Sequence, residues 1–67
     1  MINICFNDEF IQIPDRHSLM LLLKEKNCNV DYCAVSLNRQ FIPGLQHEMT
    51  ILQENDVVEI IVPMQGG

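Results

Sequence analysis

Hydrophobic and polar residues alternate at the start of the chain, in two short runs separated by a polar segment. One side of the first run carries Ile2, Ile4 and Phe6, and one side of the second run carries Ile11 and Ile13. A period of two residues is typical of a half-buried β-strand. The segment Asn7–Glu9 between the runs has the composition of a turn. The pattern therefore predicts a β-hairpin.

The spacing of apolar residues then changes to that of a helix, over Leu19–Asn27. Good helix formers fill this segment, and one helical face carries Leu19, Leu22, Leu23 and the stem of Lys26. Pro14 closes the strand before it, and either Asp15 or Ser18 can cap the helix. We therefore expect one amphipathic helix after the hairpin.

The second half of the chain predicts four further elements. These are a strand over Tyr32–Asn38, a stub strand at Phe41–Ile42, one irregular turn within Leu45–Thr50 and a last strand over Val57–Val62. Ile51-Leu52 is expected to return to the core. A turn at Gln53–Asp56 precedes the last strand, and Asn55 can take a positive φ there.

This order of elements predicts an α+β fold with a mixed sheet of four to five strands and one helix packed on one face. The first and last strands are the most apolar, so we expect them to lie centrally and next to each other. The helical crossover implies one parallel pair of strands.

Some apolar residues fall outside this core. Alternation in the last strand places Val58, Ile60 and Val62 inward, and Val57, Glu59 and Ile61 on the open face. Phe10 also points outward, so Phe10 and Ile61 either form a docking patch or pack at the sheet edge. Met20 and Leu21 likewise either cover the sheet margin or form a contact patch.

Size and charge narrow the possible functions. A chain of 67 residues is one domain at most, and its net charge of −5 argues against nucleic acid and anionic membranes as partners. The same charge suits a partner with a basic groove. Because the longest apolar run is Leu19–Leu23, we expect no secretory signal and no membrane span.

The cysteines and histidines form no recognisable catalytic or metal-binding motif. Cys5, Cys28 and Cys33 are odd in number and lack a disulfide spacing, which indicates reduced thiols in the cytoplasm. A catalytic thiol remains an alternative for them. His17 and His47 stand far apart, and we expect both to be solvated or loop residues without a metal.

The printed sequence ends in Gly66-Gly67, directly after the last strand, Pro63 and Met64-Gln65. Glycine has no Cβ, so such an end is thin and can thread a narrow channel to deliver a carboxylate. The simpler interpretation is a frayed terminus or a cloning scar.

The motifs in their order resemble those of the ubiquitin-like β-grasp sulfur carriers, and the ThiS family most closely. They are Phe6-Asn7-Asp8 at the hairpin turn, Ser18 followed by Leu22-Leu23 in the helix, Leu37-Asn38 and Phe41-Ile42-Pro43 around the stub, and Glu54-Asn55-Asp56 at the acidic turn. From that turn to Gly67 no gap is needed. The resemblance implies a single β-grasp domain over residues 1–67, whose flexible, extended tail begins at residue 62 or 63.

The chain departs from the family pattern at three places. The family often has Asn-Gly where this chain has Asn38-Arg39, and Arg where it has Gly44. Small or polar residues usually precede the glycines, whereas this chain has Pro63 and Met64. These departures bear on partner details and leave the expected tail chemistry unchanged.

The resemblance implies that the chain is a co-substrate of enzymes and has no catalytic residue or bound cofactor of its own. An E1-like adenylyltransferase of the ThiF type would use ATP to adenylate the carboxylate of Gly67. Sulfur from a persulfide donor would then convert it to a thiocarboxylate, which a ThiG-like thiazole synthase would use for thiamine. Gly66 would keep the approach clear. Partner contacts are expected from Phe10, Glu59, Ile61, Met64 and Gln65.

Three alternatives share parts of this interpretation. The molybdopterin-synthase small subunit, MoaD, has the same tail chemistry but usually a larger middle section. A ubiquitin-like modifier would join Gly67 to lysines of other proteins. A plain β-grasp binding domain of the TGS type would make the terminal glycines incidental.

Overall fold

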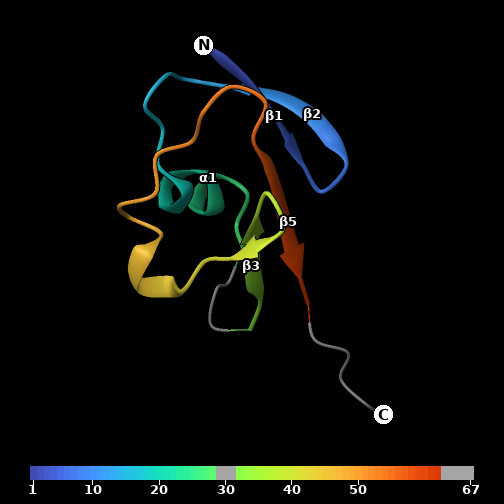
Figure 1. Ribbon diagram of the computed structural model, residues 1–67, viewed down its shortest axis with the longest axis vertical. Coiled ribbons are helices and arrows are strands. Elements are labelled where there is room, and N and C mark those ends of the chain that lie inside the picture. The colour runs from blue at the N-terminus through green and yellow to red at the C-terminus, as the bar shows by residue number, and fades with distance from the viewer. Residues whose placement is uncertain (29–31, 63–67) are drawn as a thin grey trace.

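The computed structural model describes residues 1–28 and 32–62 (Figure 1). Its elements are β1 (Ile2–Phe6), β2 (Glu9–Ile13), α1 (Leu19–Glu25), β3 (Ala34–Leu37), β4 (Gln40–Phe41), the 3₁₀ helix η1 (Gly44–Gln46) and β5 (Val57–Ile61). These helices and strands follow one another along the chain in the order that the hydrophobic pattern predicts. The expected irregular turn is η1 with the turn that follows it.

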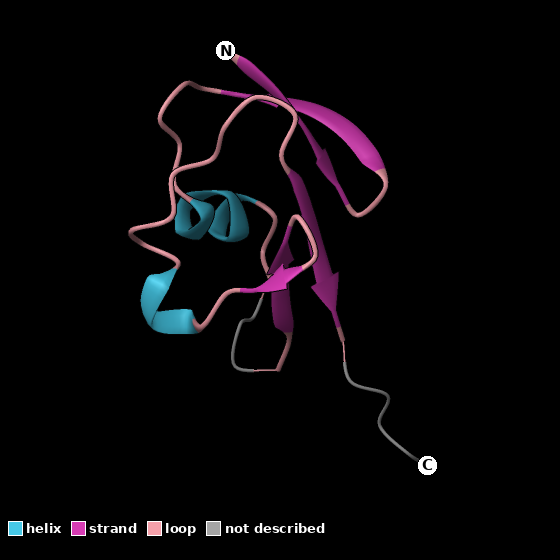
Figure 2. Cartoon of the chain, viewed as in Figure 1, coloured by secondary structure: helices cyan, strands magenta, loops and turns pink. Residues whose placement is uncertain are grey.

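The five strands form one mixed sheet in the order β2-β1-β5-β3-β4 (Figure 2). β1 and β5 pair in parallel, and the other neighbouring strands are antiparallel. This confirms that the first and last strands are adjacent and that the crossover through α1 creates a parallel pair. β5 lies in the middle, with a strand on each side.

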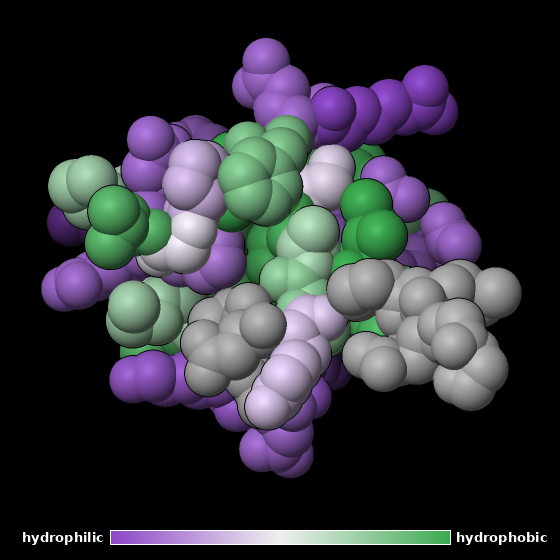
Figure 3. All heavy atoms as spheres, turned by 90° about the horizontal axis from the view of Figure 1, so that it is seen from below, coloured by the Kyte–Doolittle hydropathy of each residue, from purple (hydrophilic) through white to green (hydrophobic). Residues whose placement is uncertain are grey.

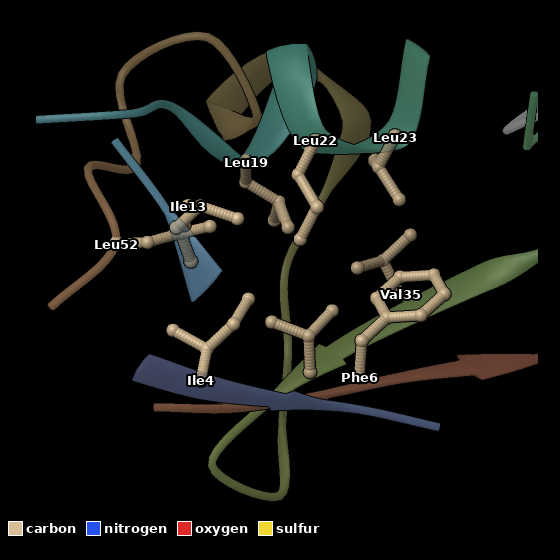
Figure 4. Close-up of a cluster of buried hydrophobic side chains, with 9 residues drawn as sticks. Ile4, Phe6, Ile13, Leu19, Leu22, Leu23, Val35 and Leu52 are labelled. Carbon is tan, nitrogen blue, oxygen red and sulfur yellow. The ribbon is translucent and has the colours of Figure 1, made fainter. Parts of the chain in front are cut away.

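The core lies between α1 and one face of the sheet (Figure 4). The helix contributes Leu19, Leu22 and Leu23, and the rest of the chain contributes Ile4, Phe6, Ile13, Val35, Leu52 and Val58. Each buried aliphatic or aromatic side chain contributes roughly 1.5–3 kcal/mol relative to its exposed state. The alternation of β1 and the helical spacing of α1 correctly predicted most of these buried residues. Lys26 shares that face of the helix, with its ammonium 5.6 Å from the centre of the Phe6 ring.

Two caps define the ends of α1. The hydroxyl of Ser18 accepts a hydrogen bond from the Leu21 amide at 3.1 Å, so Ser18 is the N-cap and Asp15 is not. At the other end Asn27 takes a φ of 56°, and the Cys28 amide donates to the Leu23 carbonyl at 2.9 Å. This is a Schellman motif. It ends the helix at Glu25, two residues before the predicted Asn27.

Tight turns close both hairpins. Asn7 and Asp8 have φ values of 48° and 68°, and Asn38 and Arg39 have 51° and 68°. Positive φ at both central residues is the geometry that matches the twist of the flanking strands. Asn55 takes a φ of 70°, as its position in the acidic turn predicts.

The boundaries of β3, β4 and β5 differ from the predictions. β3 begins at Ala34, two residues after the predicted Tyr32, and ends at Leu37, one residue before Asn38. Residues 40–41 form β4, so Ile42 lies just outside it. β5 ends at Ile61, whose partner Ala34 is the first residue of β3. Val62 therefore has no strand partner there and is 66% exposed, which corrects its predicted inward position.

The segment after η1 returns to the core as predicted. The Leu52 amide donates to the His17 carbonyl at 2.9 Å, and the Leu19 amide donates to the Thr50 carbonyl at 2.8 Å. Leu52 is buried, whereas its neighbour Ile51 is partly exposed. No helix within the described residues is long and apolar enough to cross a membrane.

Candidate functional site

The Gly-Gly tail itself lies outside the described residues, as do Met64 and Gln65. The structure instead shows how the end of β5 at Ile60-Ile61, from which the tail continues, is held. We name these two residues the base of the tail. Val58 is fully buried, and Ile60 packs against the core from the same side of β5. Ile61 and Val62 are both exposed, so the chain leaves the core after Ile60.

Two asparagine side chains hold β5 from the neighbouring turns. β1 ends at Phe6, so its backbone does not reach Ile60. The Ile60 amide instead donates to the side-chain oxygen Oδ1 of Asn7 at 2.8 Å. On the other side the Val57 amide donates to Asn38 Oδ1 at 2.9 Å, and Asn38 Nδ2 donates to Asp56 Oδ1 at 3.0 Å. These side-chain oxygens therefore accept hydrogen bonds where a neighbouring strand has already turned back, and the Asn7 bond holds β5 near its end.

The predicted contact residues of the sheet all lie on the face opposite α1. Phe10 is 86% exposed, Ile61 is 56% exposed and Glu59 is half-buried. They are not all neighbours, however. Cys5 pairs with Phe10 on one side and with Val57 on the other, so Phe10 is level with the first residue of β5. Ile61 lies four residues further along β5, which is about 13 Å in the strand direction, and β5 is two strands across from Phe10 in β2. The structure thus places Phe10 and Ile61 on one face but does not bring them together.

Phe41 was not among the predicted contact residues, yet it lies on the same face. Ser36 pairs with Phe41 in β4 and with Glu59 in β5, which places the three residues in one row. A strand of only two residues shows no alternation, so the sequence carried no signal for the direction of Phe41. We name Phe41, Glu59 and Ile61 the open-face patch. It adjoins the base of the tail.

A shallow polar groove of about 340 Å³ lies beside this patch. Its described lining consists of Asp8, Asn38, Arg39, Val57 and Glu59, so both hairpin turns contribute to it. Two carboxylates and one guanidinium therefore surround the first half of β5. A partner that docks on this face meets charged groups as well as apolar ones.

Both histidines are loop residues, which agrees with one of the two expected alternatives, but they are buried and not solvated. His17 Nε2 lies 3.1 Å from Glu25 Oε2, and His47 Nε2 donates to the Ile42 carbonyl at 2.9 Å. A buried imidazole needs such partners, and each histidine ties a loop to another segment. Within residues 1–28 and 32–62, no group of three or more potential metal ligands comes together.

All three cysteines are half-buried free thiols. Burial raises the pKa of the Cys28 thiol, and the nearby Cys33 acts in the same direction while Lys26 opposes them. A raised pKa keeps Cys28 protonated at neutral pH, whereas a nucleophilic thiol needs the opposite shift. Cys28 therefore does not have the environment of a catalytic cysteine.

The ThiS family model matches residues 4–67, which includes Gly66 and Gly67. The chain belongs to the ThiS family. Its fold is that of the crystal structure of the thiamine biosynthesis protein ThiS from Geobacter metallireducens, with a TM-score of 0.84 and 23% identity over 98% of this chain and 100% of the other. No curated protein matched the chain.

Proposed function

We propose that this ThiS-family chain is a sulfur carrier for thiazole formation in thiamine biosynthesis, and that Gly67 is the residue that carries the sulfur. The observation that supports the proposal most is the family match, which extends through the two terminal glycines of the printed sequence. The central position of β5 is consistent with it, because a fixed base determines how far the tail reaches into a partner.

The proposed chemistry begins at the carboxylate of Gly67. A carboxylate is a poor acyl donor, and a ThiF-like enzyme activates it with ATP to give an acyl-adenylate and pyrophosphate. The terminal sulfur of a persulfide then attacks the acyl carbon, and AMP leaves. A thiol cleaves the remaining S–S bond, which releases the thiocarboxylate and a disulfide. A ThiG-like thiazole synthase takes the sulfur, and the carboxylate is regenerated.

In this scheme the partner enzymes supply the catalytic groups and the ATP site. The chain supplies a fold, a docking face and a tail that is narrow because Gly66 and Gly67 have no side chains. The carrier would act in the cytoplasm, where its free thiols stay reduced.

The open-face patch is our candidate for contact with the activating enzyme. Phe41 and Ile61 offer exposed apolar surface on this face. Glu59 lies in the same row as Phe41 with Ser36 between them, and Ile61 lies two residues further along β5. Met64 and Gln65 would follow into the channel of the partner. The net charge of −5 favours a basic groove on that partner. Phe10 would contact it only if the interface reaches the far end of the sheet.

Intact mass spectrometry tests the proposed function. The chain is incubated with ATP, a ThiF-like enzyme and a persulfide source, and we expect a mass gain equal to one oxygen replaced by sulfur. Deletion of Gly67 should abolish that gain while the melting temperature stays within error, because an exposed tail contributes little to the core. A large loss of stability, or no gain for the intact chain, would contradict the proposal.

The same reaction separates the pathways. If thiazole synthase consumes the thiocarboxylate and molybdopterin synthase does not, the chain belongs to the thiamine pathway. The reverse result assigns it to the molybdopterin pathway. Conjugates on lysines in cells would indicate a protein modifier.

A further inference from the structure

A groove of about 520 Å³ lies on the helix side of the molecule, away from the open-face patch. One wall consists of Met20, Leu23 and Lys24, which lie on one side of α1, and of Asn27 in the Schellman motif that follows. Cys28 continues this wall, and Gly44 and His47 form the opposite one. We name this feature the helix-side groove. The helical part of this wall, from Met20 to Lys24, spans about 6 Å at the rise of an α-helix, enough for one turn of a bound segment.

Apolar surface continues beyond the groove along the turn that contains η1. Leu45 follows Gly44 directly and is 93% exposed, and Met49 is also largely exposed. Figure 3 shows apolar side chains that project at the margin of the molecule on the side of η1. Full burial of one such leucine is worth about 1.5–3 kcal/mol. A small ligand within the groove would leave Leu45 exposed, so a macromolecular partner fits this surface better.

The charge of the groove differs from that of the open face. Lys24 lines the groove, and none of its described lining residues is acidic. Glu48 is exposed nearby but does not belong to the lining. In contrast, Asp8 and Glu59 both line the groove on the open face. A segment that brings a carboxylate to Lys24 is therefore complementary on the helix side, although the molecule as a whole is negative.

We propose that the helix-side groove is a second interaction surface, which binds an apolar segment of a partner protein that carries an acidic side chain. The apolar side chain packs against Met20 and Leu23, and the carboxylate pairs with Lys24. Because α1 covers one face of the sheet and the open-face patch lies on the other, two partners can bind at once. This proposal does not rest on the sulfur chemistry.

Two synthetic helical peptides test the proposal. They share one leucine-rich face and differ at a single flanking position, which is Glu in one and Gln in the other. Binding to the ¹⁵N-labelled full chain is followed through its backbone amide signals at physiological salt. We expect shifts confined to α1, η1 and their flanking turns, with the Glu peptide binding about two- to fivefold more tightly, as one partly exposed ion pair allows.

Matched variants separate the charge contribution of Lys24 from the apolar contribution of Leu45. Lys24→Gln should remove the preference for the Glu peptide, whereas Lys26→Gln should retain it, because the Lys26 ammonium lies over Phe6 and does not line the groove. Leu45→Ser should weaken both peptides by about tenfold if Leu45 becomes buried. Leu21→Ser, on the same helix but outside the groove lining, should leave both affinities unchanged.

Three results would overturn the proposal. The first is shifts on the open-face patch instead of α1 and η1. The second is a preference for Glu that persists in the Lys24→Gln variant. The third is the absence of any shift with millimolar peptide while the amide spectrum shows a folded chain.

Discussion

At the scale of single residues, backbone conformation explains the choice of asparagine or aspartate at most turn positions, although not the choice of Arg16 and Arg39. Among the described residues, positive φ is found at Asn7, Asp8, Arg16, Asn27, Asn38, Arg39 and Asn55. Asparagine and aspartate tolerate this region better than other non-glycine residues, because their short polar side chains bond locally. The turns of this chain are therefore built with asparagine where many proteins use glycine.

Gly44 is a contrasting case, and its substitution gives a first prediction. A Cβ added at Gly44 would meet no atom within 4 Å, and its φ lies outside the positive range. Gly44→Ala should therefore stabilise the protein by about 0.4–1 kcal/mol, because alanine restricts the unfolded chain. Asn55→Ala is the matched variant of opposite sign. At a φ of 70° alanine should cost about 1–2 kcal/mol.

Urea denaturation of both variants measures these changes in the free energy of unfolding. Destabilisation by Gly44→Ala would mean that the start of η1 is strained in a way that its φ does not reveal.

At the scale of elements, α1 and β5 depend on groups outside themselves. An isolated helix of seven residues is too short to be stable in water, so α1 relies on Ser18, the Schellman motif at Asn27 and its three buried leucines. β5 is longer than the paired part of its neighbour β1 and relies on the side chain of Asn7. In both cases a side chain completes hydrogen bonding that the backbone leaves unfinished.

Replacement of Asn7 tests this dependence. Asn7→Gly keeps a residue that accepts a φ of 48° but removes the acceptor for the Ile60 amide. We expect a loss of about 0.5–1.5 kcal/mol in the free energy of unfolding. Faster hydrogen exchange of the Ile60 amide should accompany it.

Asp8→Gly provides the control within the same turn, since its φ is 68° and glycine is well suited to that conformation. This variant should leave the Ile60 amide protected. Equal exchange in the two variants would show that the Asn7 side chain does not hold β5.

At the scale of the whole molecule, the sheet separates two faces with different surfaces. The open face carries the open-face patch and the acidic residues Asp8 and Glu59, whereas the other side carries α1, η1 and the helix-side groove. The base of the tail belongs to the sheet, so a partner that binds the tail and the open face at once gains from both.

Ile61→Glu tests the role of the open face. Ile61 is 56% exposed, so the variant should lose less than about 1 kcal/mol of stability. Affinity for the activating enzyme, measured by calorimetry, should fall at least about tenfold if Ile61 becomes buried in the interface.

Leu21→Glu is the matched control, because Leu21 is 47% exposed and lies on α1 at the other side of the molecule. It should retain the affinity of the unaltered chain. If Ile61→Glu unfolds the protein while binding by the remaining folded fraction is normal, then Ile61 belongs to the core.

Local pattern by itself determined the elements and most of the core of this protein. The alternation of Ile2, Ile4 and Phe6 and the helical spacing of Leu19, Leu22 and Leu23 predicted which faces are buried, because side-chain direction depends on residues a few positions away. Composition and order also carried the resemblance to the family.

Only the tertiary structure decided the features that depend on residues far apart in the chain. The register of Cys5 with Val57 separates Phe10 from Ile61, and the pairing of Ser36 places Phe41 in the same row as Glu59. The same applies to the hydrogen bond from the Met20 amide to the His47 carbonyl and to the end of strand pairing before Val62. No local period encodes these relations, since they arise when separate elements pack together and each backbone and side-chain group finds its partner.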